Sequence, residues 1–142
     1  MNENCVIQTK HLTVKLGGKT ILNDISLDVP RNSIYGFLGP NGAGKTTLIR
    51  ALLNLVTSKR GSVNILNSNP SINRMELMKS IGCLVERPLL YPHLTGIENL
   101  TLYQKAFNLS KKDMEGALEM VQMTEHSHQK TGTYSLGMKQ RM

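Results

Sequence analysis

The sequence predicts an α/β fold with an antiparallel β portion at its start, a partial parallel core sheet and a helical subdomain towards its end. Three patterns predict this fold: alternating segments around a glycine pair, apolar runs beside a glycine-rich loop, and helical periodicity behind capping residues. Hydrophobic residues make up 39% of the 142 residues, which suffices for one folded domain. We expect a single domain over residues 1–142, with a core in 1–85 and a helical subdomain in 86–142.

The antiparallel portion is predicted from the start of the chain. Residues 6–16 and 20–29 are rich in β-forming residues and alternate between apolar and polar side chains. Gly17 and Gly18 separate them, and a glycine pair is typical of a tight turn between antiparallel strands. Residues 62–66 predict a further strand.

The parallel core sheet is predicted from two short apolar runs, 33–38 and 81–85. Strands that are buried on both faces are apolar throughout, and these runs have that composition. Apolar residues recur at helical spacing in 46–56, and a short helix is predicted in 74–80. These segments complete the predicted core.

Capping residues predict two helices in the last third of the chain, after an irregular loop that contains two prolines. Thr95 can cap a helix in which Glu98 is the third residue, the arrangement of a capping box. A second helix is predicted over 111–123, after Ser110. Together these helices form the predicted helical subdomain.

Composition argues against several classes of protein. The net charge is +7, but the basic residues are scattered without aromatic residues among them, so we expect a solvated surface and no nucleic-acid partner. No apolar stretch approaches the roughly 20 residues of a membrane span, and the N-terminus lacks the apolar segment of an export signal. The two cysteines are too few for a disulfide framework, which indicates a cytoplasmic setting.

A glycine-rich loop between a predicted strand and a predicted helix is the strongest chemical signal in the chain. Residues 39–46 match the pattern G-x-x-x-x-G-K-[ST] of phosphate-binding loops. Glycines let backbone N–H groups turn towards a phosphate, and the helix start adds partial positive charge. We expect Lys45 to act catalytically on the β- and γ-phosphates and the Thr46 hydroxyl to bind Mg²⁺. The predicted binding residues are Gly39, Pro40, Asn41, Gly42, Ala43, Gly44, Lys45, Thr46 and Thr47.

The loop alone leaves GTPases, kinases and transport ATPases open, because all of them use it. Further segments narrow this choice: GPNGAGKTTL, IGCLVE, YPHLTGIENL and YSLGMKQR occur in this order. With these segments the chain resembles the ATP-binding subunits of ABC transporters over nearly its whole length. It is most similar to the exporters that protect bacteria against bacitracin and lantibiotics.

The resemblance implies an ATPase that uses ATP and Mg²⁺ to drive export of, or immunity to, a peptide antibiotic. It also implies a transmembrane permease and a second ATP-binding subunit as partners, and a location on the inner face of the cell membrane. Two alternatives stay open. One is a soluble ABC-type ATPase that acts on ribosomes or DNA, and the other is a nucleotide-binding module without enzymatic activity.

Three features depart from the usual pattern of this family. The signature LSGGQ is substituted at two positions, by Leu136 and Met138, and the resemblance implies that Ser135 and Gly137 face a γ-phosphate. Glu86 replaces a glutamine, and the resemblance implies a catalytic role and a contact with Mg²⁺ for it. Leu16 replaces an aromatic residue that stacks on adenine, so we expect weak discrimination between bases.

The resemblance further implies elements that residues 1–142 do not contain. Family members continue past the signature into a strand that ends in Asp-Glu, which supplies the catalytic base, and later into a histidine. We therefore expect an N-terminal fragment that ends at the signature and is inactive alone. The strands predicted at 33–38 and 81–85 would lack their neighbours, and unpaired strands favour aggregation.

Overall fold

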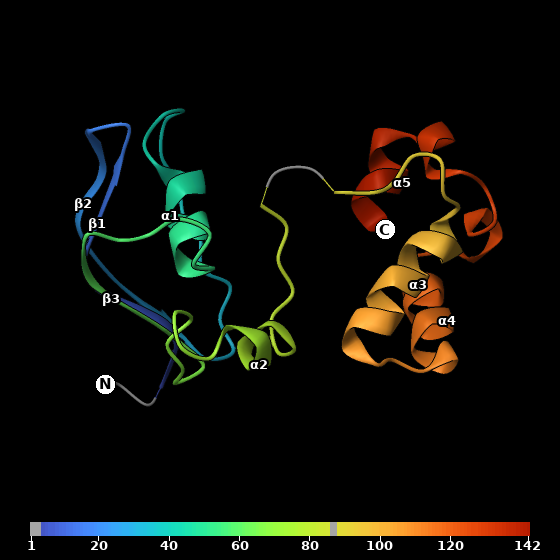
Figure 1. Cartoon of the computed structure of the whole chain (residues 1–142), viewed down its shortest axis with the longest axis horizontal. Coiled ribbons are helices and arrows are strands. Elements are labelled where there is room, and N and C mark those ends of the chain that lie inside the picture. The colour runs from blue at the N-terminus through green and yellow to red at the C-terminus, as the bar shows by residue number, and fades with distance from the viewer. Residues whose placement is uncertain (1–3, 86–87) are drawn as a thin grey trace. The chain divides into compact units, whose positions relative to one another are not determined.

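A computed structural model describes residues 4–85 and 88–142, which fall into two compact units, Met1–Val85 and Glu86–Met142. The first unit holds a sheet and two helices, α1 and α2. The second unit is helical (Figure 1). Each unit is described by itself below.

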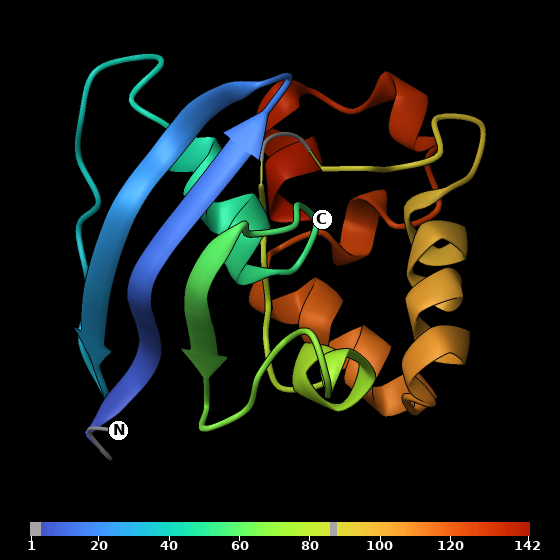
Figure 2. The ribbon, with the colours of Figure 1, turned by 60° about the vertical axis from the view of Figure 1, so that its left-hand side comes forward.

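A three-stranded antiparallel sheet forms the first unit, with the strand order β2-β1-β3 (Figure 2). The strands are β1 (Cys5–Leu16), β2 (Lys19–Pro30) and β3 (Arg60–Ile65). Gly17 and Gly18 connect β1 to β2 with φ angles of 54° and 80°. A side chain is strained in this left-handed region, which explains the glycine pair. The predicted hairpin is therefore confirmed.

One face of the sheet packs against helix α1 (Lys45–Leu52), and helix α2 (Arg74–Met78) adds to the same core. Leu12 and Val14 from β1 are fully buried beneath them. Burial of such aliphatic side chains stabilises a fold by about 1.5–3 kcal/mol each. The buried cluster consists of Leu12, Val14, Leu22, Leu48, Ala51, Leu52, Ile65 and Leu77.

The predicted parallel strands are wrong for this structure. Residues 33–38 and 81–85 form no strand, and the described residues contain no parallel pair. Ile34 and Leu38 are 104% and 93% exposed, although Ile81 still packs at the edge of the core. The apolar pattern expresses a tendency towards burial, but a strand also needs a neighbour for its N–H and C=O groups. No described segment provides that neighbour.

The second unit contains α3 (Gly96–Phe107), α4 (Lys111–Met120) and α5 (Leu136–Arg141), with single 3₁₀ turns between α4 and α5. The predicted capping box at Thr95 and Glu98 is confirmed, since each residue bonds the backbone N–H of the other. Helix α4 ends earlier than predicted because Gln122 adopts a left-handed φ of 55°. Leu118, Met123 and Tyr134 form the small core of this unit.

We predict that the stability of the helical unit falls less on acidification in Glu98→Gln than in the parent. The backbone N–H of Thr95, and then its hydroxyl, hold the pKa of Glu98 below its ordinary value of 4.5. Because the folded pKa is lowered, Glu98 stabilises the fold above pH 4.5, and this contribution disappears as the pH falls through the folded pKa. Thermal unfolding followed by circular dichroism from about pH 6 to about pH 3 measures the effect.

Glu119→Gln is the matched control, since the Glu119 side chain makes no hydrogen bond or ion pair in the described residues. The control should keep the parent's pH dependence. Equal pH dependence in Glu98→Gln and the parent would contradict the prediction.

Candidate nucleotide-binding site

The glycine-rich loop adopts a conformation that side chains disfavour. Gly42 and Gly44 have φ angles of 84° and 90°, both in the left-handed region. Between them, the N–H of Ala43 donates to the carbonyl oxygen of Pro40 over 3.2 Å, which closes a turn. The loop therefore curls back on itself directly before helix α1.

Gly44 also lies close to strand β2. A Cβ atom at this position would lie 2.9 Å from Leu22 Cδ2 and 3.2 Å from the carbonyl oxygen of Ile21. A side chain would fit only if the end of the Leu22 side chain moved and the backbone at Ile21 shifted by a few tenths of an ångström. The absence of a Cβ at Gly44 therefore lets the start of helix α1 approach the sheet.

Lys45 folds back onto the loop that precedes it. Its Nζ donates to the carbonyl oxygens of Gly39 and Pro40 at 2.6 and 2.8 Å. An ammonium group has three donors, so these two bonds leave one donor for another acceptor. The structure thus brings the charge of Lys45 to the mouth of the loop.

The first turn of helix α1 leaves backbone N–H groups for a ligand. Gly44 is the N-cap and offers no side-chain acceptor, and the first turn contains no acidic residue. The N–H of Leu48 is the first to find an acceptor along the helix, the carbonyl oxygen of Gly44 at 2.9 Å. The N–H groups of Lys45, Thr46 and Thr47 precede it and have no partner within the helix. Free N–H groups and partial positive charge at a helix start favour phosphate.

Mg²⁺ fits this site only with help from a nucleotide. No three His, Cys, Asp or Glu side chains gather as a metal site within the described residues. Thr46 is half-buried in the first turn of α1 and carries the hydroxyl that the sequence predicts as a ligand. Since Mg²⁺ usually takes most of its ligands from water and phosphate, one protein hydroxyl beside a phosphate loop is compatible with it.

The remaining predicted residues lie elsewhere in the chain. Leu16 is 40% exposed at the end of β1, next to the hairpin turn. Ser135 is the N-cap of α5, and its hydroxyl accepts the N–H of Met138 over 3.2 Å. Gly137 is exposed in the same helix. Both belong to the second unit, and Glu86 lies outside the described residues, so the roles of all three stay predictions.

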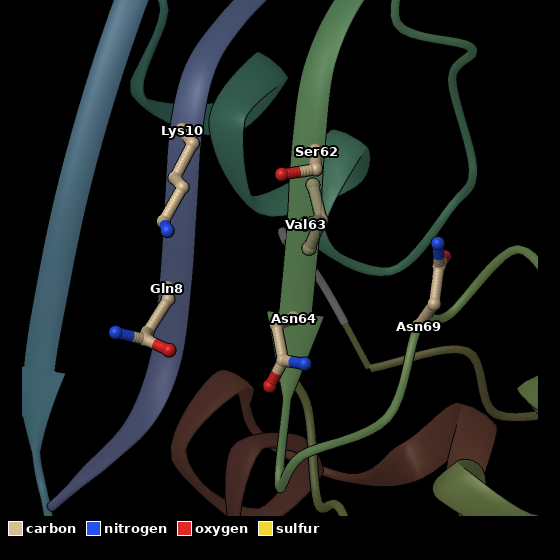
Figure 3. A pocket seen from close by; sticks show the side chains of 6 residues that line it. All are labelled: Gln8, Lys10, Ser62, Val63, Asn64 and Asn69. Atoms are coloured by element: carbon tan, nitrogen blue, oxygen red, sulfur yellow. The ribbon is translucent and has the colours of Figure 1, made fainter. Parts of the chain in front are cut away.

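A separate small pocket lies on the sheet, away from the loop residues. Figure 3 shows its lining: Gln8 and Lys10 on β1, Ser62, Val63 and Asn64 on β3, and Asn69 in the following loop. Its volume of about 190 Å³ is below the roughly 300 Å³ at which ligand pockets begin. Its size therefore does not indicate a second nucleotide site.

Sequence reasoning missed two buried polar residues in the second unit, Asn99 and Thr131, which are 2% and 0% exposed. The Thr131 hydroxyl bonds the carbonyl oxygen of Tyr91, 40 positions away, and Asn99 bonds the backbone of Tyr91 and the side chain of Thr131. No periodicity or motif spacing indicates such contacts, because they form only when the chain has folded. None of the helices in the described part of the chain is both long and apolar enough to cross a bilayer.

A glycine-rich loop that leads into an uncapped helix start is the arrangement typical of phosphate-binding loops. The family model of the ABC transporter matches residues 22–142. The chain belongs to this family. Because the match begins in β2 and includes the loop and the whole second unit, it covers every predicted site residue except Leu16.

Two relatives and one solved structure describe the similarity further. The chain is 41% identical to the bacitracin transport ATP-binding protein BcrA of Enterococcus faecalis over 96% of its own length and 45% of that protein. It is 31% identical to the lantibiotic transport ATP-binding protein SrtF of Streptococcus pyogenes, over 96% of the chain and 58% of SrtF. A solved structure of an ATP-binding subunit of an ABC transporter matches 96% of the chain and 58% of its own, with a TM-score of 0.84 and 26% identity. The chain thus spans about half the length of these proteins.

We predict that Gly44→Ala lowers thermal stability and binding of an ATP analogue more than Gly42→Ala does. Both glycines have a left-handed φ, where a side chain costs about 1–2 kcal/mol. An added Cβ has open space at Gly42 but meets Leu22 and the backbone of Ile21 at Gly44. Thermal unfolding and binding of a fluorescent ATP analogue should both rank the parent above Gly42→Ala, and Gly42→Ala above Gly44→Ala. Equal losses in the two variants would show that the contact with β2 is unimportant.

Proposed function

We propose that the protein containing this chain binds and hydrolyses ATP with Mg²⁺ and uses this reaction to export, or give immunity to, a peptide antibiotic. The observation that carries the proposal is the Lys45 ammonium at the mouth of a glycine loop whose helix start is uncapped. The names of the relatives BcrA, a bacitracin transport protein, and SrtF, a lantibiotic transport protein, support the substrate class.

The residues of the loop suit the chemistry of a triphosphate. The N–H groups that open helix α1 bind phosphate oxygens, and Lys45 offsets the negative charge that develops on the γ-phosphate. Thr46 and Glu86 are the proposed Mg²⁺ ligands.

Two partners belong to this proposal. A second ATP-binding subunit would offer Ser135 and Gly137 to the nucleotide held by the first, and the two would meet about a two-fold axis. A permease would hold the pair at the inner face of the cell membrane. A groove lined by Pro88, Leu90, Pro92 and Leu136, with Thr131 and Lys139, supports this partner by offering apolar surface after position 86.

We predict that Lys45→Ala weakens binding of MgATP about 10- to 100-fold, because a charge-assisted hydrogen bond contributes about 1.5–3 kcal/mol. Titration with a fluorescent ATP analogue measures the affinity, and in the full-length protein hydrolysis should fall at least about a hundredfold. Lys59→Ala is the matched control, since Lys59 is an exposed lysine of the same unit. Unchanged affinity and turnover in Lys45→Ala would refute the proposed function.

We also predict that ATP and GTP bind with affinities within about threefold of each other, because Leu16 gives a base only apolar contact. Leu16→Tyr should raise the affinity for ATP by up to about tenfold, since an aromatic pair contributes about 0.5–1.5 kcal/mol beyond burial. Leu55→Tyr places the same ring on another exposed leucine and should change nothing. A strong preference of the parent for ATP would contradict the prediction.

A further inference from the structure

The segment YPHLTGIENL folds against the residues that precede Ser135. The N–H of Thr131 donates to Leu94 O at 2.9 Å, and the N–H of Gly132 donates to Pro92 O at the same distance. Gly132 has no room for a side chain, since an added Cβ would lie 2.8 Å from Pro92 O. Residues 91–95 and 130–134 therefore lie side by side, although about 35 positions separate them in the chain.

Asn99 holds this arrangement from the first helical turns of α3. Its Oδ1 accepts the N–H of Tyr91 at 2.8 Å. Its Nδ2 lies 2.9 Å from Thr95 O and 3.2 Å from Tyr91 O. A buried amide is costly unless its polar atoms are paired, and here both ends are paired. Asn99 thus fixes the loop that begins at Tyr91.

Thr131 joins the same carbonyl from the other side. Its hydroxyl donates to Tyr91 O at 2.8 Å, and Asn99 Nδ2 lies 3.4 Å from the hydroxyl oxygen. Asn99 and Thr131, called the polar clasp below, therefore share one backbone carbonyl between them. The shared acceptor ties α3, loop 91–95 and segment 130–134 together.

Tyr134, the residue before Ser135, is also fixed by hydrogen bonds. Its N–H donates to Thr131 O at 3.2 Å, and its hydroxyl donates to His126 O at 2.6 Å. Burial raises the pKa of Tyr134, so the hydroxyl keeps its proton and stays a donor. An added Cβ at Gly96 would lie 2.5 Å from this hydroxyl oxygen, which explains the glycine at the start of α3.

We infer that Asn99 and Thr131 are positioning residues for Ser135, and this inference rests on the proposed function of Ser135. The clasp joins a largely exposed loop to the segment that ends at the exposed N-cap of α5. Because buried, fully paired polar groups favour one geometry, loop 91–95 and Ser135 move as one body.

The test compares Thr131→Val, which removes the hydroxyl at equal shape, with Thr131→Ser, which keeps it. Both measurements use the full-length protein. Its affinity for MgATP measures whether the glycine-rich loop is intact. Its ATP-dependent self-association in the analytical ultracentrifuge measures whether Ser135 acts on the nucleotide of the second subunit. We expect Thr131→Val to keep the affinity within about twofold and to weaken association at least about tenfold. Thr131→Ser should associate with an affinity within about threefold of the parent's. Tyr134→Phe keeps the packing and should weaken association to a smaller extent.

Ser135→Ala separates this inference from the proposed function. If Ser135→Ala weakens association and Thr131→Val does not, the positioning role is refuted while the proposed function stands. If Thr131→Val loses ATP affinity and association together, the clasp only maintains the fold and the inference fails. If ATP does not promote association of the parent, or if Ser135→Ala associates with ATP as strongly as the parent does, the proposed action of Ser135 fails, and the inference fails with it.

Discussion

The uncapped start of helix α1 is the constraint on which the candidate site depends. Helices α3 and α4 begin with Thr95 and Ser110, which accept a backbone N–H, and with Glu98 and Asp113, which add a carboxylate in the first turn. Gly44 offers neither group to α1. Of these three helices, α1 alone therefore keeps N–H groups and partial positive charge for an anion. The proposed phosphate site thus depends on the absence of a side-chain cap at the start of α1.

The antiparallel sheet positions that helix start. Leu22 on β2 is 4% exposed and belongs to the buried cluster beneath α1, and it is also the side chain nearest to the missing Cβ of Gly44. One leucine therefore contacts both the core and the loop. Leu48 anchors the helix in the same cluster. Because close-packed cores resist displacement, the sheet sets where the free N–H groups point.

Local patterns of the sequence predict the local structure well. The glycine pair predicts the hairpin, Thr95 with Glu98 predicts the cap of α3, and the glycine-rich loop is found before a helix as expected. The pattern fails at 33–38, because an apolar run says nothing about which strand will pair with it. It also fails to indicate Asn99, whose partners lie in a loop and in a distant segment. Whether residues 33–38 form a strand and which groups Asn99 bonds both depend on contacts between segments that are distant in the sequence.

The two ends of the glycine loop are held in different ways. Gly44 is fixed by its approach to β2, whereas Gly39 follows residues 33–38, which are exposed and form no strand. The bonds from Lys45 to the carbonyls of Gly39 and Pro40 therefore hold the first end of the loop. A phosphate that enters competes for this ammonium group, because it offers charged acceptors in place of neutral ones. Binding would thus loosen the first end of the loop unless phosphate contacts to its N–H groups replace the lost bonds.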